Sequence, residues 1–237
     1  MARSEEIPAP LADPALAPRH VVFLFGLMYL ATSMLGVTWG RSIDPAIRFA
    51  WEELVIHGLA ALFGAMLALA IPQLRRSLPT LYSPARVPLS ARDALVFLAL
   101  MIAWGYGAHR MLVLFPLLQW HPALLTVLAL EHAPSVGATF LLLWSLNAGL
   151  FAPFIEELVF RGYLQNLWQR RWGLWPGVLL SALAFGAVHL QYGVFATIAG
   201  VFLSLVYLKY RSLWPGTLLH ALYNLVAAPY SLGTVLL

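Results

Sequence analysis

The chain has 237 residues, of which 61% are hydrophobic and 10% are charged, and it contains no cysteine. A soluble domain is usually about 45–50% apolar and about 25% charged, so the composition excludes an ordinary soluble globular protein. The absence of cysteine excludes disulfides, thiolate metal sites and a cysteine nucleophile. The net charge of +4 is small and spread among loops, which indicates membrane orientation rather than nucleic-acid binding. We predict an all-α, multi-pass transmembrane helix bundle.

The chain begins with an acidic, proline-rich stretch that lacks the basic segment and apolar core of a signal peptide. We predict a flexible extramembrane tail over residues 1–19 and a single transmembrane bundle over residues 20–237. Seven apolar runs follow, each close to the ~20 residues that a helix needs to cross the hydrocarbon. They cover residues 20–40, 50–71, 93–119, 137–160, 175–190, 192–209 and 213–231. An eighth span is expected if 93–130 holds two helices broken near Pro116 and Pro122.

Basic residues fall mainly on one side of the predicted membrane. With seven spans, eleven of the 14 Lys and Arg residues lie in the amino-terminal tail and in the loops after spans two, four and six. Arg41 and Arg48 lie on the other side. By the positive-inside rule, the amino terminus is cytoplasmic. Thirteen arginines against one lysine favour a prokaryotic source, so we expect the cytoplasmic membrane of a bacterium.

Two segments of the carboxyl-terminal part are closely similar: LWPGVLLSALAF (174–185) and LWPGTLLHALYN (213–224). Trp is typical of the membrane interface, and Pro is typical of the first turn of a helix. We predict that both segments start helices at the cytoplasmic face, with proline at the first helical position. An internal duplication and a common way of beginning a membrane helix both explain the match.

Few ionisable side chains fall within the apolar runs, and each is a candidate functional residue because its burial in lipid is costly. With two amides, they are Glu52, Glu53, His57, His109, Arg110, Asn147, Glu156, Glu157, His189, His220 and Asn224. Glu52 and Glu53 follow a short loop, so we assign them a structural role, although Glu53 and His57 share a helix face. His109 and Arg110 are assigned to the bundle interior, without a role in chemistry.

The stretch FIEELVFRGYL (154–164) carries two adjacent carboxylates. Glu157 and Arg161 are four residues apart and share a helix face, so we predict an ion pair that is buried. Burial of Arg161 requires that the following segment, 162–173, begins below the membrane surface as an interfacial helix. Glu156 points about 100° away from its neighbour, and this leaves it free to act as a general base.

Two further pairs are also four residues apart. His220 and Asn224 can both donate hydrogen bonds, as a stabiliser of an oxyanion must. Phe185 is expected to pack beside His189. A base, two imidazoles and an amide are sufficient for general-base hydrolysis of an amide bond without a covalent nucleophile. Each of these polar residues, taken alone, is also explained by a structural role as a hydrogen-bonding partner in helix packing.

The signatures of other intramembrane hydrolases are missing. The sequence has no HExxH for a zinc enzyme and no GxSxG-like serine for a rhomboid-type enzyme. Asp13, Asp44 and Asp93 lie in the tail or at span ends, so an aspartyl enzyme is excluded. A glutamate with two histidines can bind zinc in principle, but the usual spacing of metal ligands is lacking. We predict no metal and no cofactor.

Three motifs occur in order on three apolar runs: EExxxR in EELVFRGYL, FxxxH in FGAVH and HxxxN in HALYN. With these motifs, the chain resembles the CPBP family of intramembrane proteases (CAAX protease and bacteriocin-processing, also called Abi) over about residues 150–230. The resemblance implies a glutamate-dependent, metal-independent peptidase. It implies that Glu156 is the general base, that His189 helps to hold the attacking water, and that the neighbouring ion pair orients the site. His220 and Asn224 would form the oxyanion hole.

We therefore predict an intramembrane endopeptidase that acts on a membrane-associated protein or peptide within the lipid bilayer. Members of the family clip prenylated CAAX proteins, process bacteriocin leaders, act in protein sorting or regulate without known cleavage. A bacterial source favours a membrane-anchored tail over a prenylated one. Two alternatives remain open: a non-catalytic scaffold or immunity-type protein that binds a partner, and a small proton-coupled transporter with Glu156 in its relay.

Overall fold

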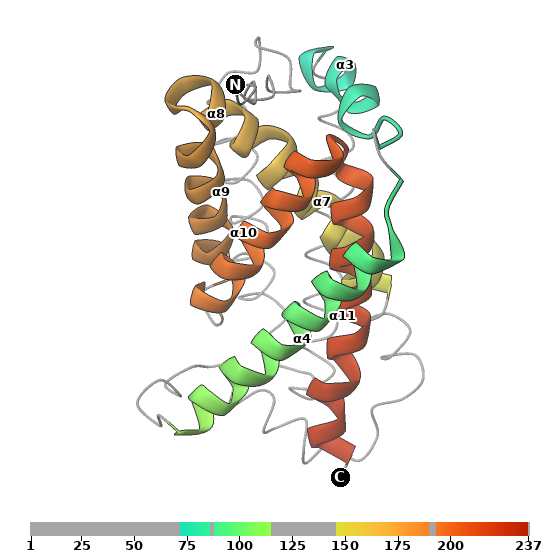
Figure 1. Ribbon diagram of the computed structural model, residues 1–237, viewed down its shortest axis with the longest axis vertical. Coiled ribbons are helices and arrows are strands. Elements are labelled where there is room, and N and C mark those ends of the chain that lie inside the picture. The colour runs from blue at the N-terminus through green and yellow to red at the C-terminus, as the bar shows by residue number, and fades with distance from the viewer. Residues whose placement is uncertain (1–71, 86–87, 115–145, 190–192, 237) are drawn as a thin grey trace, which may run out of the picture. The chain divides into compact units, whose positions relative to one another are not determined.

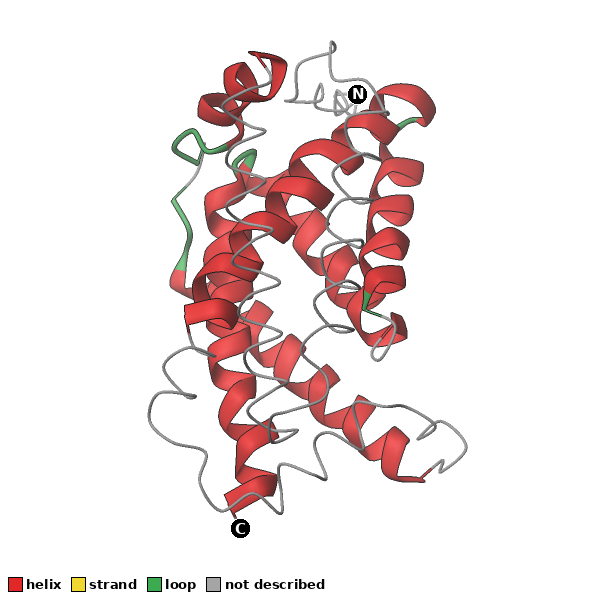
Figure 2. Cartoon of the chain, turned by 180° about the vertical axis from the view of Figure 1, so that it is seen from behind, coloured by secondary structure: helices red, strands yellow, loops and turns green. Residues whose placement is uncertain are grey.

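The computed structural model describes residues 72–85, 88–114, 146–189 and 193–236, and within these ranges every regular element is a helix (Figures 1 and 2). The helices are α3 (Pro72–Leu81), α4 (Ala91–Leu114), η2 (Asn147–Phe151), α7 (Ala152–Glu157), η3 (Leu158–Gln165), α8 (Asn166–Trp172), α9 (Leu174–Val188), α10 (Gly193–Tyr210) and α11 (Leu213–Leu236). Of these, η2 and η3 are π-helical, with wider turns than an α-helix. The described part of the chain therefore confirms the all-α prediction.

Several sequence predictions fall outside the described residues. They concern the tail 1–19, the spans 20–40 and 50–71, the break near Pro116 and Pro122, and the side chains of Glu52, Glu53 and His57. Among the described helices, α10 is long and apolar enough to cross a bilayer, and α9 is apolar but has 15 residues. The count of seven spans stays a prediction.

The chain divides into two compact units. Among the described residues, the first unit contains α3 and the stretch Glu156–Gly216. The second unit contains the described parts of Ser90–Ile155 and Thr217–Leu237. The first unit therefore contains both acids of the EExxxR motif and the histidine of the FxxxH motif, whereas the HxxxN motif belongs to the second.

The first unit is built around η3. All eight residues of η3 are buried, and η3 packs against α9 and α10. Figure 1 shows α9 and α10 side by side, and α8 leads from η3 into α9. The helical segment that contains the two acids does not end near residue 160, where the predicted span ends, but continues to Trp172. Because η3 is buried on every side, its polar groups must find partners inside the protein.

The two LWPG segments form equivalent first turns. Leu174 and Leu213 are the first residues of α9 and α11, as the similarity predicts. Proline is the third helical residue rather than the predicted first, and it is tolerated because N–H groups of a first turn have no intrahelical partner. The glycine that follows each proline lies in close contact: a Cβ on Gly177 would be 2.7 Å from the backbone N of Gln169.

The predicted loop between spans two and three contains a helix, α3, that the sequence analysis did not predict. Its last residue, Leu81, is fully buried, and its Cδ1 would lie 3.2 Å from a Cβ placed on Gly162 of η3. The turn after α3 reaches the start of α11. There Ser212 Oγ donates to the carbonyl of Ser83 at 2.6 Å and accepts a bond from the N–H of Trp214 at 3.3 Å. Ser212 therefore caps the amino terminus of α11.

Candidate active site

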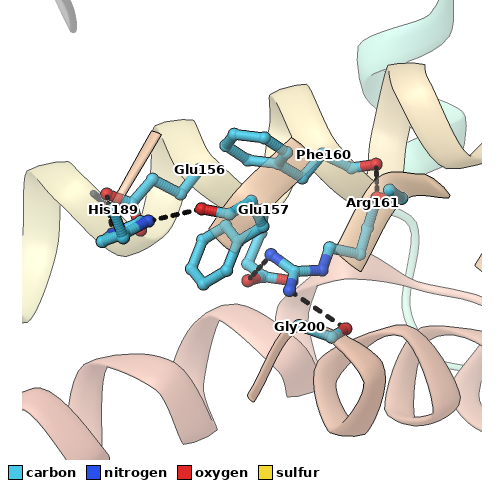
Figure 3. Close-up of polar contacts among 8 residues, drawn as sticks. Glu156, Glu157, Phe160, Arg161, His189 and Gly200 are labelled. Atoms are coloured by element: carbon cyan, nitrogen blue, oxygen red, sulfur yellow. Dashed lines mark hydrogen bonds and ion pairs between the residues drawn. The ribbon is translucent and has the colours of Figure 1, made fainter. Parts of the chain in front are cut away.

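The ion pair predicted from the EExxxR spacing is present. Arg161 Nη1 lies 2.8 Å from Glu157 Oε1, and both residues are completely buried (Figure 3). The second terminal nitrogen of the guanidinium donates to the carbonyl of Gly200 in α10 at 3.2 Å. The guanidinium carbon lies 4.5 Å from the ring centroid of Phe185 in α9. One buried side chain thus fixes η3 against both neighbouring helices, as the predicted burial of Arg161 requires.

The aromatic contact predicted from the FxxxH motif is also present. The rings of Phe185 and His189 have centroids 4.4 Å apart, and Phe160 packs edge-on against Phe185 at 5.0 Å. The guanidinium of Arg161 and the imidazole of His189 therefore both contact the Phe185 ring. This ring connects the buried ion pair to the histidine.

His189 directly follows the last residue of α9, Val188, close to the end of the predicted span 175–190. Its backbone has φ −94° and ψ 51°, and its Nδ1 lies 2.7 Å from the carbonyl oxygen of Phe185. A carbonyl oxygen only accepts hydrogen bonds, so Nδ1 carries the hydrogen and donates it. In the neutral imidazole, Nε2 is then an acceptor.

The free acceptor nitrogen faces the first glutamate of the motif. His189 Nε2 lies 3.8 Å from Glu156 Oε1, which is too long for a direct hydrogen bond. The side chain of Glu156 is 13% exposed and that of His189 is 31% exposed. A carboxylate and a neutral Nε2 both accept, so a water molecule can donate one hydrogen to each of them. The pair can hold and polarise a water.

The HxxxN residues lie on α11. His220 is buried and Asn224 is partly buried. Gly216, His220 and Asn224 follow one another at intervals of four residues and therefore share one face of the helix. A Cβ placed on Gly216 would lie 3.2 Å from Glu157 Oε2. The distance of His220 and Asn224 from Glu156 stays a prediction.

The remaining polar candidates receive no new role. His109 and Arg110 lie in α4 and Asn147 begins η2, but their side chains are outside the described part of the structure. In the described ranges, no three His, Asp or Glu side chains gather at one place.

Two further polar residues, which were not predicted from the sequence, support the site. Asn166 Nδ2 lies 2.8 Å from the carbonyl of Arg161, 2.9 Å from that of Gly162 and 2.8 Å from the hydroxyl of Tyr207. Ser181 Oγ donates to another carbonyl of η3 at 2.7 Å. These bonds satisfy backbone groups of the π-helical segment and stabilise its unusual turns. Their signals in the sequence are weak: Asn166 lies beyond the predicted span 137–160, and Ser181 is a hydroxyl in the middle of the apolar run 175–190.

Residues 138–226 match the family model for the type II CAAX prenyl endopeptidase, Rce1-like. This segment is Rce1-like. It contains all the predicted site residues: Glu156, Glu157, Arg161, Phe185, His189, His220 and Asn224. Rce1-like proteins belong to the CPBP family, so the resemblance is confirmed for these residues.

A protein of Escherichia coli, described as an uncharacterized 24.3 kDa protein, is 34% identical to the chain over 84 residues. The alignment covers 35% of this chain and 36% of that protein. The chain thus spans about a third of the length of the curated relative it matches. No solved structure matches the chain. Because Rce1-like proteins are membrane peptidases, the matched segment supports a peptidase, and the apolar helix α10 is consistent with a membrane location.

Proposed function

We propose that this chain is an intramembrane endopeptidase that hydrolyses a peptide bond in a membrane-anchored protein or peptide by glutamate-activated water. The observation that carries the proposal is the pair formed by Glu156 and His189, whose Oε1 and Nε2 atoms are 3.8 Å apart. The Rce1-like segment supports a substrate that is held in the bilayer. We place the protein in the cytoplasmic membrane of a bacterium, with its amino terminus in the cytoplasm.

In the first step, a water molecule donates one hydrogen bond to Glu156 and another to Nε2 of His189. Glu156 takes a proton from this water as its oxygen forms a bond to the carbonyl carbon of the substrate. The electron pair of the carbonyl moves to its oxygen, which gives a tetrahedral oxyanion. His189 keeps its orientation because its other nitrogen is held by the carbonyl of Phe185.

In the second step, the oxyanion re-forms a carbonyl as the C–N bond breaks, and the leaving nitrogen receives the proton from Glu156. The products are a carboxylic acid and an amine, which exchange a proton to give the carboxylate and the ammonium ion, and Glu156 returns to its ionised form. His220 and Asn224 are assigned to the oxyanion hole, because both are hydrogen-bond donors and share one face of α11.

The two adjacent glutamates have different roles in this mechanism. Glu157 is paired with Arg161 at 2.8 Å in a completely buried position, so its charge is used in holding η3. The side chain of Glu156 is partly exposed, and its Oε1 lies 3.8 Å from Nε2 of His189. A carboxylate that is reached by water and lies beside an acceptor nitrogen is suited to be a base.

The test is a survey of protein termini in membranes from cells that carry the wild-type chain, Glu156→Gln or no copy. Gln keeps the shape of the side chain and cannot take a proton. Leu150→Met, an exposed position of the preceding η2, controls for changes in the same helical segment. We expect defined termini to disappear both in the deletion and in Glu156→Gln, at equal protein abundance.

The other outcomes separate the alternative functions. Unchanged termini with rescue of the deletion phenotype by Glu156→Gln would contradict hydrolysis and favour a scaffold that binds a partner. Unchanged termini with proton-coupled flux in vesicles that depends on Glu156 would favour a transporter.

A further inference from the structure

Polar residues recur at every fourth position of the segment that carries the two acids. They are Glu157, Arg161, Gln165 and Gln169, named here the polar row. The first three are 0% exposed and Gln169 is 7% exposed. A step of four residues overshoots a turn of α-helix and falls short of a turn of π-helix. The mixture of π-helical η3 and α-helical α8 therefore keeps the row nearly straight.

The side-chain amides of the two glutamines in the polar row have no hydrogen-bond partner among the described residues. Both amide atoms of Gln165 and both amide atoms of Gln169 are buried and unsatisfied, as is Nε of Arg161. Almost all buried polar groups in proteins are bonded either to protein or to ordered water. These four amide atoms therefore require partners that the described protein groups do not supply.

Two hydrogen bonds connect the η3–α8 segment with α10. Arg161 donates to the carbonyl of Gly200 at 3.2 Å. Asn166, five residues later, donates to the hydroxyl of Tyr207 at 2.8 Å. The two bonds bracket a stretch along which the two segments lie side by side.

Gln165 and Ser204 lie between these two bonds in sequence, one on each side. Ser204 is 0% exposed, and its hydroxyl has no partner among the described residues. The amide and the hydroxyl can each donate and accept, but they do not bond to each other. A water molecule has two donors and two acceptor sites, so one water can bond to an amide and a hydroxyl together.

We propose that η3 and α10 hold ordered water between Gln165 and Ser204, and that the polar row supplies water from Gln169 to the Glu156–His189 pair. The binding of water is inferred from the burial of these polar side chains and from their lack of hydrogen-bond partners among the described residues. Its delivery to the site rests on the proposed function.

The two ends of the row fit this role. Gln169 is followed within three residues by Arg171 and Trp172, which are exposed, so this end of the row lies near the surface of the first unit. At the other end, Glu157 directly follows Glu156 in the chain, and Glu156 Oε1 lies 3.8 Å from His189 Nε2. An intramembrane hydrolase consumes one water per cleavage, and lipid on the outside of the helices supplies none.

The test is hydroxyl-radical labelling of the full chain in lipid nanodiscs by X-ray pulses in H₂¹⁸O. Radicals formed from bound water label side chains beside it even where bulk solvent cannot reach. Tyr207 is the reporter, with an exposure of 1%, and Phe97 in α4, with an exposure of 6%, is the dry reference. We expect labelling of Tyr207 well above that of Phe97. Labelling of Tyr207 no stronger than that of Phe97 would overturn the proposal.

The double variant Gln165→Met, Ser204→Ala removes the polar groups with little change in shape. We expect the labelling of Tyr207 to fall to the Phe97 level, without a loss in melting temperature, because both groups are replaced by apolar ones. Leu164→Met, a neighbouring buried position, should leave the labelling unchanged. Persistent labelling in the folded double variant would contradict the assignment of these two residues.

Activity separates the two parts of the proposal. If water is delivered through the row, the double variant lowers kcat and leaves KM unchanged. Labelling of Tyr207 without any Glu156-dependent cleavage would retain the water site and reject the proposed function. Cleavage without labelling would retain the function and reject the water site.

Discussion

Glu157 and Arg161 meet at 2.8 Å in the interior of the first unit, and neither side chain is exposed. The desolvation cost of two buried charges is large, so such a pair contributes less to net stability than its short distance indicates. The pair mainly fixes the positions of helices, because the guanidinium also bonds to the carbonyl of Gly200 and contacts the ring of Phe185. The pair therefore holds the helix that carries Glu156 against the helix that ends at His189.

Breaking the pair on one side should be strongly destabilising. Arg161→Met leaves a buried carboxylate without this partner, so we expect the free energy of unfolding to fall by about 3–5 kcal/mol. Adding Glu157→Gln should recover most of the loss. Unfolding of both single variants and the double variant in nanodiscs measures the coupling. Additive losses would contradict a coupled pair.

Asn166 should be sensitive to loss of its donor group. Asn166→Asp places oxygen against the carbonyls of Arg161 and Gly162, so we expect a loss of about 1–3 kcal/mol or more in the free energy of unfolding. Tyr207→Phe removes only one acceptor of the Asn166 side chain and should cost about 1 kcal/mol. Equal unfolding of wild type and Asn166→Asp would show that these bonds are unimportant.

Gly177 should not tolerate a side chain. A Cβ there would lie 2.7 Å from the backbone N and 2.9 Å from the Cα of Gln169, and backbone atoms cannot easily move away. We expect Gly177→Ala to cost about 1–3 kcal/mol. The matched control is Gly162→Ala, whose Cβ would meet movable methyl groups of Leu81 and Leu213 at 3.2 Å. A melting temperature that falls as much for the control would count against this explanation.

The contacts that follow from short-range spacing were predictable from sequence. A separation of four residues brings side chains together on a helix, and this gave the Glu157–Arg161 pair and the Phe185–His189 contact. The burial of Arg161 followed from the cost of a charge beside lipid. The three motifs led to the family, which the match over 138–226 confirms.

Features that depend on tertiary packing were not predictable. The predicted span 175–190 ends near the observed end of α9 at Val188, but the bond of the His189 ring to the carbonyl of Phe185 could not be read from the sequence. The π-helical turns of η3 depend on side-chain donors that bond to its carbonyl groups. Asn166 of α8 and Ser181 of α9 supply these donors. The burial of one end of helix α3 depends on its packing near η3, which the sequence does not show. The four-residue spacing of the polar row can be read from the sequence, but the burial of its side chains cannot.

Removal of metal ions should leave the activity intact. In the proposed mechanism a carboxylate activates the water, and His189 has only one free ring nitrogen because the other bonds to Phe185. We expect cleavage that depends on Glu156 to be unchanged by EDTA and by phenanthroline. Loss of cleavage on chelation, with recovery on addition of zinc, would contradict water activation by the carboxylate alone.

The central claim is that Glu156 activates water, and the rate of cleavage by Glu156→Gln tests it most directly. The substrate is one identified by the survey of termini, and rates are measured in nanodiscs and normalised to folded protein. We expect Glu156→Gln to lower kcat by about 10²–10⁴-fold while its melting temperature stays near that of wild type. A kcat that stays within a few-fold of wild type in folded Glu156→Gln would contradict water activation by Glu156.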